Sequence, residues 1–95
     1  GYADAEQAAK AKVYEMRTYY TLPGRLPNLH ARFRDHTMKL FAKHGMENVI
    51  YTTPQGVENE LVYLLAHDSR EAAKASFDAF RQDPEWIAAR DASEK

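Results

Sequence analysis

The side chains best suited to chemistry alternate along one short segment, VYEMRTYY at residues 13–20. Glu15, Arg17 and Tyr19 lie two residues apart, so they share one face if the segment is a β-strand. An arginine that points into an enclosed interior presents several donors to a carboxylate or a phosphate. Arg17 is therefore the main candidate for binding an anionic ligand. The competing interpretation is a structural ion pair with Glu15, or with Glu47 on a neighbouring strand.

Aromatic residues and a histidine extend this candidate site. Tyr19, Tyr51 and Tyr63 have the amphipathic side chains that line pockets for small aromatic ligands, but tyrosines in a sheet also serve as core packing. His67 ends a predicted strand, and nothing in the sequence separates a ligand-binding histidine from a surface one. Trp86 either covers the core or forms a cavity wall. The candidate ligand-binding residues are therefore Glu15, Arg17, Tyr19, Tyr63, His67 and Trp86.

The sequence assigns no catalytic residue, no cofactor and no metal site. It contains no cysteine, no glycine-rich phosphate loop and no Ser/His/Asp set. His30, His36 and His44 fall in one predicted helix at spacings of six and eight residues, whereas two metal ligands on one helix lie about four residues apart. His44 is expected to be a hydrogen-bonded residue at the end of that helix.

Length and charge limit the partners. Ninety-five residues form one domain with a thin core. The net charge is −1, which argues against nucleic acid, and no stretch reaches the roughly 18 apolar residues of a membrane span. The lack of cysteine leaves the compartment open, either cytoplasmic or exported. Five basic residues gather in one predicted helix, where we expect a solvated face: Arg25, Arg32, Arg34, Lys39 and Lys43.

The elements that must position these residues begin after residues 1–12, which we interpret as a flexible arm. The segment 13–20 is dense in β-branched and aromatic residues, which predicts a strand. Its face with Tyr14 and Met16 is expected to lie under the helices, which would turn Arg17 away from them, towards a barrel interior. A helix over 25–44 follows, ended by Gly45. Its apolar stripe consists of Leu26, Leu29, Phe33, Leu40 and Phe41.

Two further strands and two helices complete the predicted order. Strands at 47–53 and 60–66 are joined by a short turn, as in an antiparallel hairpin. A capping box at 68–71, beginning with Asp68, opens the next helix, and Asp83 with Pro84 begins a final helix to about residue 93. The order β-α-β-β-α-α is that of an α+β, ferredoxin-like layer with an antiparallel sheet that lacks its last strand.

The strand at 60–66 predicts an assembly state. Its residues Leu61 to Ala66 are apolar without alternation, whereas a strand with one face in water alternates. Two helices cover only one face of a small sheet, so a second copy of the sheet is expected to cover the other. We therefore predict a homodimer. The simpler alternative is a monomer in which only Tyr63 is partly exposed.

Together these segments resemble the NIPSNAP family. VYEMRTYYTLPGRL, LFAKHGMENV, LVYLLAHDS and FRQDPEWIAARDASEK carry the resemblance, over about residues 13–95. It implies ferredoxin-like subunits that pair sheet to sheet into a dimeric α+β barrel, and family members usually continue past the end of this chain with a final strand. Animal relatives are associated with vesicle and mitochondrial biology, and bacterial members mostly lack an assigned activity.

Two function classes remain. The first, which we expect, is a dimeric small-molecule binding or interaction module without catalysis. The alternative is a barrel-lumen enzyme, a cofactor-free monooxygenase or isomerase in which Arg17 and a tyrosine hold a small anionic or aromatic substrate. An enclosed pocket with converging polar groups would favour the enzyme, and a filled interior with satisfied polar groups would favour the module.

Overall fold

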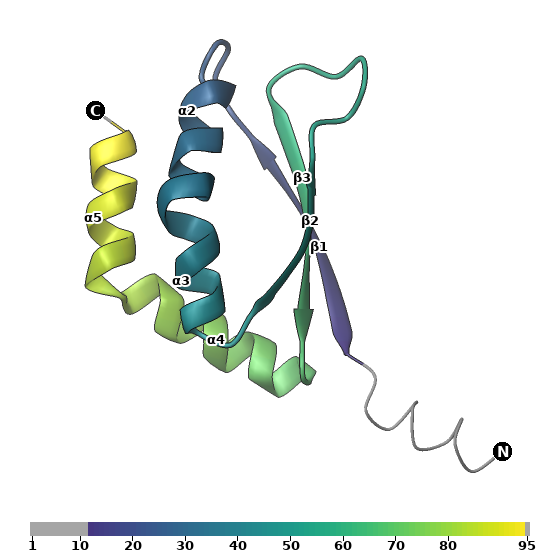
Figure 1. The fold of residues 1–95 in the computed structure, drawn as a ribbon, viewed down its shortest axis with the longest axis vertical. Coiled ribbons are helices and arrows are strands. Elements are labelled where there is room, and N and C mark those ends of the chain that lie inside the picture. The colour runs from purple at the N-terminus through teal and green to yellow at the C-terminus, as the bar shows by residue number, and fades with distance from the viewer. Residues whose placement is uncertain (1–11, 95) are drawn as a thin grey trace, which may run out of the picture.

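A three-stranded antiparallel sheet carries the helices on one of its two faces (Figure 1). The computed structural model describes residues 12–94, so the predicted arm lies outside the described residues except for Lys12. The strands are β1 (Val13–Tyr20), β2 (Glu47–Thr52) and β3 (Glu60–His67), in the order β1-β3-β2. The helical segments are α2 (Leu26–Arg32), η1 (Phe33–Thr37), α3 (Met38–Lys43), α4 (Arg70–Gln82) and α5 (Pro84–Ser93). The predicted α+β class and element order are confirmed.

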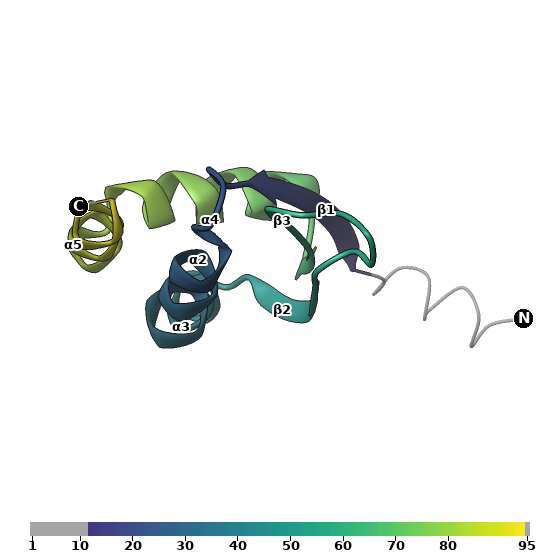
Figure 2. The same cartoon turned by 90° about the horizontal axis from the view of Figure 1, so that it is seen from above.

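The two faces of β1 are the reverse of the expectation. Tyr14 and Met16 are exposed, whereas Glu15 and Arg17 lie on the side that the helices cover. Figure 2 shows the sheet from above, with the helices to one side of it. The prediction was wrong because it placed the apolar face of β1 in the core. Here the polar side chains are buried in part, because they find partners on β3.

The first helix is continuous from Leu26 to Lys43 but changes its hydrogen-bonding pattern in the middle. The amide of Met38 donates to the carbonyl of Phe33, five residues back, which defines the π-helical segment η1. The extra residue in this turn places the Thr37 side chain in the interior, where its hydroxyl donates to the carbonyl of Arg32 at 3.4 Å. Gly45 follows the helix with a φ of 82°, a left-handed conformation that glycine adopts without strain.

The two later helices begin at side-chain caps. Ser69, and not Asp68, caps α4, because its hydroxyl accepts from the amide of Ala72 at 3.0 Å. Asp83 caps α5 as predicted and accepts from the amide of Glu85 at 2.9 Å. Lys43 and His44 also donate to Asp83, at 2.8 and 2.7 Å, so they hold the pKa of that carboxyl well below its usual range. His44 is thus the hydrogen-bonded helix-end residue that the sequence predicts.

The core lies between the sheet and the helices. Phe33 is at its centre, in edge contact with the rings of Phe41, Tyr51 and Tyr63. The apolar stripe of the first helix faces this core as predicted, with Leu26 at its margin. Trp86 also packs against it, with its ring centroid 4.6 Å from that of Phe80. The core side chains come from every layer: Leu29, Phe33, Leu40, Phe41, Met46, Leu61, Tyr63, Leu65, Phe77 and Phe80.

We expect Phe33→Ala to lower the free energy of unfolding by about 3–5 kcal/mol, because truncation of a buried phenylalanine leaves a cavity that the surroundings fill only in part. Urea denaturation followed by circular dichroism measures the change. His36→Ala, at an exposed position of the same helix, is the control and is expected to change stability by less than about 0.5 kcal/mol. Equal small effects of both substitutions would contradict the assignment of the core.

Candidate functional site

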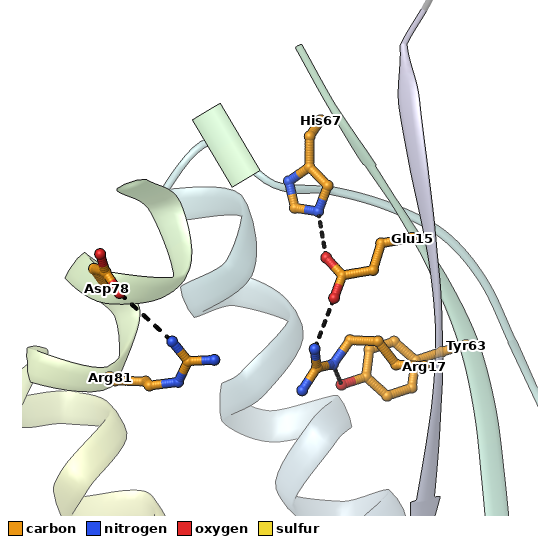
Figure 3. A network of polar contacts seen from close by, with 6 residues as sticks. All are labelled: Glu15, Arg17, Tyr63, His67, Asp78 and Arg81. Carbon is orange, nitrogen blue, oxygen red and sulfur yellow. Dashed lines mark hydrogen bonds and ion pairs between the residues drawn. The ribbon is translucent and has the colours of Figure 1, made fainter. Parts of the chain in front are cut away.

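Four polar side chains join β1 to β3 beneath α4, and we call them the β1 network: Glu15, Arg17, Tyr63 and His67 (Figure 3). The carboxylate of Glu15 is central. Its Oε2 accepts from Arg17 at 2.7 Å, and its Oε1 lies 2.9 Å from Nε2 of His67. The Nε of Arg17 donates to the hydroxyl of Tyr63 at 3.0 Å. The alternation of β1 and the antiparallel pairing of Arg17 with Tyr63 bring these four residues to one face.

The surroundings of Arg17 favour a structural role. Its guanidinium lies 4.6 Å from the centroid of the Phe77 ring, a cation–π distance, so it bridges the sheet and α4. Burial raises the pKa of the Tyr63 hydroxyl, although the neighbouring Arg17 opposes this, and Tyr63 remains a neutral phenol. The structure therefore contains the ion pair with Glu15 that was the alternative to ligand binding by Arg17.

The sequence did not decide whether His67 lies at the surface. In the structure it is one of the most buried side chains, with 1% of its surface exposed. The end of β3 turns it towards α4, where its ring lies 6.1 Å from that of Phe77. Because a carboxylate only accepts, Nε2 carries the proton in the contact with Glu15. The other ring nitrogen, Nδ1, is buried and has no partner among the described residues.

The structure divides the six predicted site residues into two groups. Glu15, Arg17, Tyr63 and His67 form the β1 network, whereas Tyr19 and Trp86 lie around a different arginine, Arg32. The guanidinium carbon of Arg32 is 5.4 Å from the ring centroid of Tyr19 and 5.2 Å from that of Trp86.

Arg32 was expected on a solvated helix face, and this expectation was wrong, because only 7% of its surface is exposed. The helix α5 packs against α2 and covers it. The Nη1 of Arg32 donates to the hydroxyl of Ser93 at 3.0 Å, and the buried Nε of Arg32 has no partner among the described residues. The only signal in the sequence was its position three residues after Leu29, at the edge of the apolar stripe.

Three cavities border the first helix, and Arg32 lines two of them. A cavity of about 390 Å³ is lined by Arg25, Asn28, Arg32 and Ser93 together with apolar residues from the end of β1. Two others, of about 250 and 260 Å³, border the first helix. None of these three is lined by a member of the β1 network. Within residues 12–94 no three His, Asp or Glu side chains converge as metal ligands do.

The arrangement of the β1 network indicates what it can do chemically. Glu15 already bonds to His67 and Arg17, so a substrate would have to displace one of these partners. We therefore interpret the network as a polar bridge that fixes the sheet to α4.

Among the helices in the described part of the chain, none has the length and hydropathy to cross a bilayer.

Arg17→Leu is expected to lower the free energy of unfolding by about 1–3 kcal/mol, because Glu15 and Tyr63 each lose a partner in a half-buried site. More than a third of the Arg17 side chain is exposed, so the loss is smaller than for a fully buried ion pair. Chemical denaturation measures it, with Arg34→Leu as the control on an exposed pair with Asp35. Unchanged or raised stability of Arg17→Leu would show that Arg17 is kept for a ligand.

Comparisons with known proteins agree with this fold. The NIPSNAP family model matches residues 14–95. Two crystal structures of the same protein from Agrobacterium tumefaciens are similar to this chain. One, described as a NIPSNAP family protein with unknown function, is 26% identical with a TM-score of 0.75 over 84% of this chain and 73% of that chain. The other is 27% identical with a TM-score of 0.72 over 80% of this chain and 74% of that chain.

A third similar structure is an uncharacterized NIPSNAP domain protein from Burkholderia xenovorans, 25% identical with a TM-score of 0.69 over 79% of this chain and 74% of that chain. No curated protein matched the sequence. The family model covers nearly the whole described domain. The match includes all four residues of the β1 network and the helix α4 that covers them. This chain belongs to the NIPSNAP family.

Proposed function

We propose that this protein is a homodimeric binding or interaction module without catalysis, in which two copies pair through the uncovered faces of their sheets. One observation carries the proposal. An apolar row crosses the sheet on the side without helices, where Met16 of β1, Leu64 of β3 and Ile50 of β2 lie opposite one another. Met16 is 74% exposed and Ile50 is 55% exposed.

We call this side of the sheet the open face, and it carries further apolar and aromatic residues beyond the row. Tyr14 and Tyr20 are exposed at either end of β1, and Val62 lies half-buried between them on β3. An antiparallel sheet with one face in water normally carries polar residues there. A large exposed apolar patch marks an interaction site, and most homo-oligomers are dimers with two-fold symmetry. A second copy presents the same apolar row, so pairing about a two-fold axis would remove both rows from water.

The alternative of a barrel-lumen enzyme has less support. It needs Arg17 on the open face, but Arg17 lies on the opposite face, under α4. The open face offers the hydroxyls of Tyr14 and Tyr20 and those of two threonines, with the carboxylates of Glu47 and Glu60 at its edges. The polar groups that could act together chemically are bonded to each other in the β1 network. These features favour a module over a catalyst.

Sedimentation velocity at tens of micromolar is expected to show a dimer of the wild-type chain. Met16→Lys is expected to give a folded monomer, because a lysine at this exposed site is tolerated in one copy but would be desolvated in the dimer. Val57→Lys is the matched control, an exposed apolar residue in the loop between β2 and β3, and is expected to leave the dimer intact. A wild-type protein that sediments only as a monomer would refute the proposal.

A further inference from the structure

The buried guanidinium of Arg32 has no carboxylate partner among the described residues. Among the described residues its partners are the neutral hydroxyl of Ser93 and the rings of Tyr19 and Trp86, and its Nε has no acceptor there. The nearest acidic residue along the helix, Asp35, is paired with Arg34 at 3.0 Å. Arg17 also contacts an aromatic ring and a hydroxyl, but Glu15 neutralises its charge. A buried charge without a counterion is costly unless something supplies the opposite charge.

The cavity of about 390 Å³ gives an anion access to this charge. Arg32 forms part of its wall, and Arg25 lies at the same wall, where its Nη2 donates to the carbonyl of Ser93 at 3.2 Å. Asn28 adds an amide donor from the same helix. Two arginines and an asparagine therefore line one hollow, and such donors recognise carboxylates and phosphates.

The remaining walls select among anions. Tyr19, Leu22 and Leu29 line the cavity with apolar and aromatic surface, which suits an apolar ligand body. Glu94 also lines it, and its negative charge disfavours a dianion such as phosphate. The volume accommodates a ligand of small-metabolite size. We propose that this cavity binds the carboxylate of a small apolar acid, with Arg32 as the buried counter-charge and Arg25 as the second guanidinium.

This inference rests on the proposed binding module and names its ligand class, but it does not depend on dimerisation. The cavity lies at the end of β1 between α2 and α5. It shares Tyr20 with the open face but includes none of the three residues of the apolar row. The monomeric variant Met16→Lys should therefore bind the acid as well as the wild type does. A wild-type chain that sediments only as a monomer but binds the acid would refute the proposed dimer and leave this site in place.

Titration calorimetry and thermal shift with hexanoate test the site, with hexanamide as the uncharged analogue and inorganic phosphate as the dianion. We expect saturable binding of hexanoate at millimolar concentrations, a rise in melting temperature, and no saturable binding of either comparison compound. Arg25→Gln is expected to weaken hexanoate binding about tenfold or more, because it removes a charge-assisted hydrogen bond. Arg34→Gln, at an exposed position outside this cavity, is the matched control and should bind normally.

Arg32→Met provides a second, independent readout. If Arg32 is kept for the ligand, the variant loses hexanoate binding while its melting temperature without ligand stays equal or rises, because an uncompensated buried charge has been removed. A lowered melting temperature together with normal hexanoate binding would overturn the proposal. Equal binding of hexanoate and hexanamide, tighter binding of phosphate than of hexanoate, or no binding of hexanoate by the wild type would each overturn it as well.

Discussion

The contacts that Glu15 makes with Arg17 and His67 allow β1 to turn its polar face towards the helices. A carboxylate and a guanidinium beneath α4 would be costly alone, but together they satisfy one another and a buried tyrosine. Because successive side chains of a strand point to opposite faces of the sheet, Tyr14 and Met16 then lie on the face away from the helices. The open face is therefore a direct consequence of the β1 network.

The two partly or fully buried arginines show how the same side chain serves different purposes. Arg17 has a carboxylate partner and lies away from the three cavities, which is typical of a structural residue. Arg32 lies within cation–π distance of two rings, lacks such a partner among the described residues, and borders the largest of those cavities. Charge compensation, and not burial alone, separates a residue that stabilises the fold from one that is available to a ligand. The sheet thus has two distinct surfaces for partners, the open face and the end of β1 near α5.

Most of the fold could be predicted from the sequence, because local patterns determine it. Spacings of three, four and seven residues located Leu29, Phe33 and Leu40 in the core, and Asp83 with Pro84 located the start of α5. The orientation of β1 could not be predicted in this way, because both of its faces carry aromatic residues and the deciding contacts come from β3, which is distant in sequence. The burial of Arg32 likewise depends on α5 packing against α2. The residues of the π-helical segment show no sequence pattern that distinguishes them from an ordinary α-helix.

Sheet-to-sheet pairing is the central claim, and the distance between two copies tests it most directly. The chain has no cysteine, so Thr18→Cys on the open face and Lys74→Cys on the outer side of α4 each accept one spin label. Packed sheets lie about 10 Å apart, so pulsed electron resonance should find the Thr18 labels within roughly 20 Å of each other, and the Lys74 labels much further apart. A shorter separation at Lys74 than at Thr18, or no distance between copies at either site, would contradict the account.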